Sequence, residues 1–318
     1  MMNSFGPLWA LLDDYKAQSG TAMIQKPKKW LGYCVFAVLL TAALLYIRFP
    51  SDAVVDFLKI RAGRANPPLS LSIGRLEPSI LLGLKLEQVK LALKDAADRV
   101  VFQADRLLIR PGLLSYFGGS SSYSFDASAY KGEMKGHIEF KGGEAVSNMD
   151  AQIALSNIRI GDYSYLSSLM GRPVEGTMGG TVSFTGPSKN PGTAGSGEAK
   201  LTVVDGRLEL LQPFLTFESI DFKEMDMDLV LQQGRINVSR LDIKGEQMQG
   251  TLSGMILLKD DLANSTLNLK GTIEPFAAFF ESTGGTRDTV AFFRQRLKQG
   301  TLSFVIQGTL EAPDFKFT

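Results

Sequence analysis

The chain has 318 residues, with 34 Lys and Arg against 33 Asp and Glu, one Cys and one His. A net charge of +1 without a basic block gives no electrostatic footprint for a nucleic acid, whose binding depends on neutralising phosphates. One Cys excludes an intramolecular disulfide, and one Cys with one His excludes a Cys/His zinc site. We therefore expect no nucleic-acid partner, no metal and no cofactor.

Residues 1–29 form a segment with several apolar side chains at close spacing. Two interpretations stay open for it. In the first, the segment forms a short amphipathic helix that lies on the membrane surface or binds a cytoplasmic partner. In the second, it is frayed and disordered. The apolar residues are Phe5, Leu8, Trp9, Leu11, Leu12 and Tyr15.

Residues 30–47 carry no charge, and these about 18 residues span roughly 27 Å as a helix, enough to cross a bilayer. A cleaved signal peptide starts nearer the N-terminus, and a buried core helix keeps a polar face, so both fit less well. We predict a transmembrane anchor over residues 30–49, formed by Trp30, Tyr33, Val35, Phe36, Leu39, Leu40, Leu44, Leu45, Tyr46 and Ile47.

Basic residues precede this segment and are scarce after it. Lys26, Lys28 and Lys29 lie before it, and only Arg48 follows before Asp52. The positive-inside rule therefore predicts that residues 1–29 are cytoplasmic and that residues 50–318 form a domain on the other side of the membrane.

After the anchor, a helix is expected from Ser51 until the prolines at 67 and 68. Apolar residues then alternate with polar ones in one run after another, which indicates antiparallel sheet with one apolar face. A change of phase at Glu87-Gln88 predicts a β-bulge. The apolar positions of the first runs, which we assign to a groove or core, are Leu82, Leu84, Leu86, Leu91 and Leu93.

Glycine-centred turns are predicted between the runs, at Lys131-Gly132, Gly142-Gly143, Asp205-Gly206, Gln233-Gly234 and Lys244-Gly245. Short peripheral helices are predicted after Asp162, after Pro275 and over 286–299. The fold class is therefore mainly β: an elongated, curved antiparallel sheet with a few short helices, preceded by one transmembrane helix.

Catalytic candidates are few. His137 lies in an alternating strand without a nucleophile motif, so a solvent-facing side chain is favoured over a general base. The pairs Asp226/Asp228 and Asp260/Asp261 lack a calcium-loop glycine, which favours solvated charges over metal ligands. We predict no enzyme; a hydrolase that uses His137 is the contrasting hypothesis.

Three segments, taken in order, resemble the AsmA-like superfamily, and the layout of one anchor before about 270 β-rich residues is similar to the type II secretion system protein N family. The segments are Gly83–Leu91, Ala104–Pro111 and Gly300–Leu310 with Pro313. The resemblance implies a Gram-negative inner-membrane protein with a periplasmic domain, a sheet curved into an apolar groove, and no enzymatic activity.

The leading functional expectation from this resemblance is a non-enzymatic accessory component of type II secretion that contacts other components of that system. The alternative is a lipid-binding or lipid-transfer protein that holds acyl chains of phospholipid in the apolar groove, because a half-apolar sheet with few helices must cover its apolar face somehow. The expected partners are therefore the lipid bilayer, secretion components and phospholipid.

Overall fold

A computed structural model of the chain describes two units, which divide between Pro50 and Ser51. The first contains helix α2 (Pro27–Ile47) and the second contains one antiparallel sheet with a few short helices. The described residues are 27–65, 68–79, 83–94, 96–112, 115, 119–142, 148–188, 191–214, 217–276, 297 and 300–318.

Helix α2 covers the predicted anchor and begins three residues earlier, at Pro27, a residue suited to the first turn of a helix. Its described apolar side chains are largely exposed, from Leu40 at 48% to Ile47 at 76%. Among the residues that the structure describes, none of the helices meets the length and hydropathy expected of a membrane span. The transmembrane assignment therefore stays a prediction.

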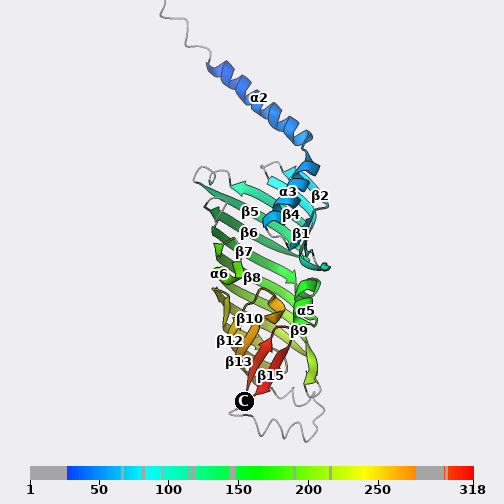
Figure 1. Cartoon of the computed structure of the whole chain (residues 1–318), viewed down its shortest axis with the longest axis vertical. Coiled ribbons are helices and arrows are strands. Elements are labelled where there is room, and N and C mark those ends of the chain that lie inside the picture. The colour runs from blue at the N-terminus through cyan, green and yellow to red at the C-terminus, as the bar shows by residue number, and fades with distance from the viewer. Residues whose placement is uncertain are drawn as a thin grey trace, which may run out of the picture. The chain divides into compact units, whose positions relative to one another are not determined.

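The second unit is one long open sheet of 15 antiparallel strands, which confirms the mainly β prediction (Figure 1). From β3 to β15 each strand pairs with the strands next to it in the chain, and β1 and β2 both pair with β3 at one edge. The strands are β1 (Leu69–Ser72), β2 (Arg75–Ser79), β3 (Gly83–Leu93), β4 (Ala96–Gly112), β5 (Ser120–Ala129), β6 (Gly132–Lys141), β7 (Asn148–Arg159), β8 (Val174–Pro187), β9 (Ser196–Phe214), β10 (Phe217–Gln232), β11 (Arg235–Lys244), β12 (Met248–Leu257), β13 (Thr266–Pro275), β14 (Leu302–Thr309) and β15 (Pro313–Phe317).

Helices of the second unit lie at the margins of the sheet. Helix α3 contacts β1 and β2, as Figure 1 shows, and the others lie in connections between strands. Their bounds are α3 (Ser51–Ala65), η1 (Ile160–Asp162), α5 (Ser164–Met170), α6 (Pro191–Ala194) and η2 (Leu262–Asn264).

The core lies in small clusters along one face of the sheet instead of between two layers. One cluster centres on Ala104, Ala127 and Ala129. A second centres on Ile160, Val203 and Phe222, and a third on Val238, Leu267 and Leu269. Because each cluster draws on neighbouring strands, packing is local along the sheet.

Two of the predicted turns differ in the structure. Asp205-Gly206 is not a turn: it lies inside β9, where Asp205 has a φ of +49° and Gly206 faces Phe222. At the β5–β6 hairpin the turn residues are Tyr130 and Lys131, with φ of +51° and +59°, and Gly132 already belongs to β6. The turn at Gln233-Gly234 is confirmed.

The phase change in β3 is present, but its mechanism differs from the predicted bulge. Gln88 has a left-handed backbone with φ of +53°, while the pairing of β3 with β4 continues from Leu86↔Leu107 to Val89↔Ala104 without a shift. The partner strand therefore changes phase at the same place, through Asp105 and Arg106, and both strands keep their apolar residues paired.

The predicted helix after Asp162 is confirmed as α5, although Asp162 does not cap it. The N-cap is Tyr163 without a side-chain hydrogen bond, and Asp162 instead pairs with Lys131 at 3.1 Å. The helices predicted after Pro275 and over 286–299 lie almost wholly outside the described residues, as do residues 1–26 with Lys26.

Candidate functional site: the apolar face of the sheet

The strand register places apolar residues and glycines opposite one another on every strand from β3 to β15. Residues that are directly paired across antiparallel strands point to the same face. The first apolar row defined in this way consists of Leu84, Ile109, Phe125, Gly136, Ile153, Val182, Ala199, Leu229, Val238, Gly254, Leu269, Ile306 and Phe315.

A second apolar row runs beside the first, two residues along each strand except β11, where a register shift makes the step three residues. It contains no polar side chain from β3 to β15. We call the two rows together the apolar face. The members of the second row are Leu86, Leu107, Ala127, Met134, Leu155, Gly180, Leu201, Met227, Leu241, Leu252, Gly271, Phe304 and Phe317.

Most side chains of the apolar face are half-buried. Ile153 and Val182 in the middle of the first row are both in this class, whereas Val238 and Leu269 further along are buried. In a two-layered protein such rows would be covered by the opposite layer. Here the face keeps part of its apolar surface accessible over the length of the sheet.

Glycines in the rows are covered by aromatic rings from the neighbouring strand. Phe125 is paired with Gly136 in the first row, and Phe304 with Gly271 in the second; a Cβ at either glycine would overlap the paired ring. Flat rings over glycines let the backbone approach closely and keep the apolar face shallow at these places.

Helix α5 packs at the margin of the apolar face, against a cluster that Met227 of the second row also contacts. Its Leu166 packs against the cluster of Ile160, Val203 and Phe222. The same seven-residue helix contacts β4 and also η2, which follows β12. Elements far apart in strand order therefore meet at α5.

Tyrosines join α5 to the neighbouring hairpins. The ring of Tyr163 lies 5.1 Å from that of Tyr130 and 6.2 Å from that of Tyr165. The Tyr130 hydroxyl accepts a hydrogen bond from the backbone N–H of Gln103 in β4, at 2.9 Å. The aromatic contacts thus fix one end of the helix to the middle of β4.

Because the tyrosine cluster is partly buried, the stability of the fold is expected to depend on pH through the Tyr163 phenol. Desolvation raises the pKa of the Tyr163 phenol to about 12, above the usual value near 10. A raised pKa stabilises the fold while the phenol is neutral, so this contribution is present below pH 10 and is lost as the pH rises toward 12. We expect the urea midpoint to fall between pH 9 and about 11.5.

Lysines also titrate in that range, so the contribution of Tyr163 must be separated from theirs. The variant Tyr163→Phe removes the phenol and leaves the lysines unchanged. Its midpoint is expected to fall less than that of the parent chain over the same interval, as measured by urea unfolding at each pH. Equal falls in both proteins would contradict the assignment to Tyr163.

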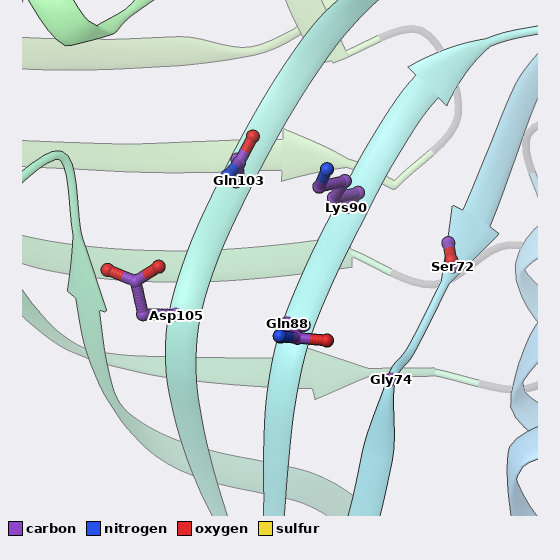
Figure 2. A pocket seen from close by; sticks show the side chains of 6 residues that line it. All are labelled: Ser72, Gly74, Gln88, Lys90, Gln103 and Asp105. Atoms are coloured by element: carbon purple, nitrogen blue, oxygen red, sulfur yellow. The ribbon is translucent and has the colours of Figure 1, made fainter.

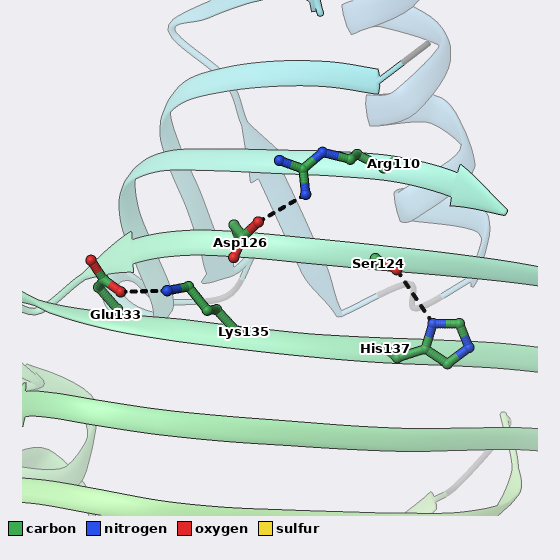
Figure 3. A network of polar contacts seen from close by, with 6 residues as sticks. All are labelled: Arg110, Ser124, Asp126, Glu133, Lys135 and His137. Carbon is green, nitrogen blue, oxygen red and sulfur yellow. Dashed lines mark hydrogen bonds and ion pairs between the residues drawn. The ribbon is translucent and has the colours of Figure 1, made fainter. Parts of the chain in front are cut away.

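The opposite face of the sheet is polar and carries ion pairs, some between neighbouring strands and some along one strand (Figure 3). Arg110 of β4 bonds Asp126 of β5 at 2.9 Å, and Lys135 of β6 bonds Glu133 at 2.8 Å. The bond to Glu133 raises the pKa of Lys135. Because these side chains are largely exposed, the pairs contribute little stability and mainly keep this face soluble.

His137 lies on the polar face and is exposed, as expected. Its Nδ1 lies 3.4 Å from the Ser124 hydroxyl, and Figure 3 shows the two side chains on neighbouring strands. Among the described residues no carboxylate is hydrogen-bonded to His137. The pair therefore lacks the third member that orients the base in a catalytic triad.

A shallow polar hollow lies where β1 ends beside β3 and β4 (Figure 2). Its side chains are exposed, so water is a sufficient occupant. It is lined by Ser72, Gly74, Gln88, Lys90, Gln103 and Asp105.

The aspartates considered as metal ligands have other partners. Asp261 caps η2: its side chain accepts hydrogen bonds from the Ala263 N–H and from the Asn264 side chain. Asp226 accepts one from the Thr202 hydroxyl at 2.9 Å. Within the described part of the chain, no group of three or more His, Cys, Asp or Glu side chains is arranged to hold a metal ion.

The predicted groove or core leucines divide as follows. Leu84 and Leu86 belong to the first and second rows, and Leu91 is paired with Phe102. Leu86 is buried at 3%, whereas Leu84, Leu91 and Leu93 are half-buried. Leu82 lies outside the described residues.

The predicted anchor residues all lie in α2, with Lys28 and Lys29 in its first turn. Sequence reasoning missed the greater part of the apolar face, from β5 to β15. The alternation was visible in each strand, but which residues stand opposite one another depends on the register, which the turns set.

No protein-family model, curated protein or solved structure matches the chain.

Proposed function

We propose that this protein is a membrane-anchored lipid binder that holds acyl chains of phospholipid against the apolar face of its sheet. The observation that carries the proposal is the two uninterrupted apolar rows, which run across every strand from β3 to β15 and in which most side chains are half-buried. An acyl chain needs an apolar surface that is continuous over its length, and it needs no specific polar partner there.

Curvature of the sheet supports the same proposal. In a flat sheet β4 and β12 would be about 38 Å apart, since neighbouring strands are about 4.8 Å apart. Yet α5, a helix of about 10 Å, contacts both β4 and the η2 turn that follows β12. Because α5 packs on the apolar side through Leu166, we infer that the sheet curves with this side concave, as in the AsmA-like resemblance.

The anchor and its orientation are part of the proposal. Residues 30–47 form an uncharged helical stretch whose described side chains are exposed, and three lysines precede it. Together with the AsmA-like resemblance, this stretch supports our proposal of a Gram-negative inner-membrane protein, with residues 1–29 in the cytoplasm and residues 50–318 in the periplasm.

A second candidate function is an accessory role in type II secretion through protein contacts. The open sheet favours it, because β1 and β2 form one edge and β15 the other. Strand edges are the usual sites of pairing with a partner strand.

Photo-crosslinking in cells separates these functions. A benzophenone amino acid is placed at Val182 on the apolar face, and the matched control is at Thr181, whose side chain points to the other face. With lipids labelled by ³²P, we expect a labelled adduct at Val182 and none at Thr181. The full chain is expressed with its own anchor in a Gram-negative host.

The other outcomes are equally informative. No labelled adduct at Val182, or equal adducts at both positions, would overturn lipid holding. An adduct at Val182 with the added mass of a protein and without label would favour the secretion role instead.

A further inference from the structure

Helix α3 has two faces, and the fold uses one of them. Val54, Val55 and Leu58 are half-buried, on the side of the helix that contacts β1 and β2. Phe57 and Ile60 lie on the outer side, one turn apart, with 62% and 57% of their surface exposed. Outside α2, they are the two most exposed large apolar side chains of the described residues.

Basic residues accompany this apolar pair. Arg61 follows Phe57 by four residues and Arg64 follows Ile60 by four, so each arginine lies one turn further along the same outer side. Asp56 is the acidic residue of that side. Exposed aromatic and aliphatic side chains beside arginines match the boundary between acyl chains and anionic headgroups.

The position of α3 in the chain agrees with such a surface. Only residues 48–50 connect it to α2, and four extended residue steps span about 14 Å. The start of α3 is thus held near the end of the proposed anchor, where headgroups lie.

We propose that the outer side of α3, formed by Phe57, Ile60, Arg61 and Arg64, docks on the surface of a bilayer that contains anionic phospholipid. This inference rests on the membrane anchorage proposed for α2. Docking would hold the start of the sheet at the membrane surface, so that a lipid leaving the bilayer meets the first strands directly.

The test uses the full chain in vesicles of phosphatidylethanolamine and phosphatidylglycerol, with Cys34→Ala as background. Nitroxide labels are attached at Phe57→Cys and Ile60→Cys, and the matched control is Lys59→Cys, an exposed position on the flank of the same helix. We expect the labels at 57 and 60 to lose collisions with a water-soluble nickel complex and to keep collisions with oxygen. The label at 59 should remain accessible to nickel.

Charge is tested by replacing Arg61 and Arg64 with Glu in the labelled chains. We expect nickel accessibility to return at 57 and 60, and vesicles of phosphatidylcholine alone to give the same result. If all three labels are equally accessible to nickel in the anionic vesicles, the docking proposal is wrong.

Flotation of the vesicles distinguishes this failure from failure of the anchor. A chain that floats but shows accessible labels at 57 and 60 retains the anchor and refutes docking by α3. A chain that does not float refutes both.

Discussion

Gly180→Ala is expected to lower the free energy of unfolding by about 4 kcal/mol, one of the largest effects of any single methyl group in this chain. Gly180 has a φ of +138°, a backbone conformation that residues with a side chain rarely adopt. It stands between Leu155 and Leu201 in the second apolar row, and a Cβ there would overlap the Lys200 carbonyl oxygen. Because the obstacle is backbone, β8 and β9 must separate to relieve it.

Urea unfolding of the full chain in mild detergent, followed by far-UV circular dichroism, measures the effect. Gly63→Ala is the control, since Gly63 lies in α3 with its nearest neighbour, the Lys94 Nζ, 3.9 Å from the position of a Cβ. Alanine favours helix over glycine, so Gly63→Ala should raise stability by about 1 kcal/mol. A Gly180→Ala protein as stable as the parent would show that the strands do not approach as described.

Phe222→Ala is expected to lower the free energy of unfolding by about 4 kcal/mol, because it removes the largest side chain of a buried cluster and leaves a cavity. Phe222 is 6% exposed and packs with Ile160 and Val203 beneath α5. Loss of the ring removes both this packing and the cover of Gly206. The control Phe57→Ala, at an exposed ring in α3, should change stability by less than about 0.5 kcal/mol.

A double-mutant cycle tests the contact between Phe222 and Gly206. Gly206→Ala alone should be destabilising, since its Cβ would overlap the ring of Phe222. In the Phe222→Ala background the same methyl enters vacated space. The double variant should therefore lose less stability than the sum of the two single losses, by about 1 kcal/mol or more. Strictly additive effects would mean that the ring does not cover Gly206.

The repeated two-residue period was enough to predict the sheet, because one apolar and one polar face leave their mark on every strand. The register was not predictable in the same way. Asp205-Gly206 has the composition of a turn, yet it lies within β9, where the pairing with Phe222 decides its conformation. Tyr130 and Lys131 have no marked turn preference, yet they form the β5–β6 turn with Gly132 paired beside them.

The candidate site was predictable at its first strands and not as a whole. Leu84 and Leu86 were identified from the alternation in β3, and their partners Ile109 and Leu107 required the register with β4. The role of α5 was hidden for a similar reason. Nothing local to Leu166 indicates that its helix contacts β4 on one side and η2 on the other.

Pairing between neighbours in the chain gives this sheet a modular length. Strands β11 and β12, for example, pair with each other, and outside this pair β11 pairs only with β10 and β12 only with β13. Without that pair, β10 would still meet β13 in antiparallel sense, with Leu229 beside Leu269 in the same row. Duplication or loss of single hairpins can therefore lengthen or shorten the sheet in evolution while every other pairing is kept.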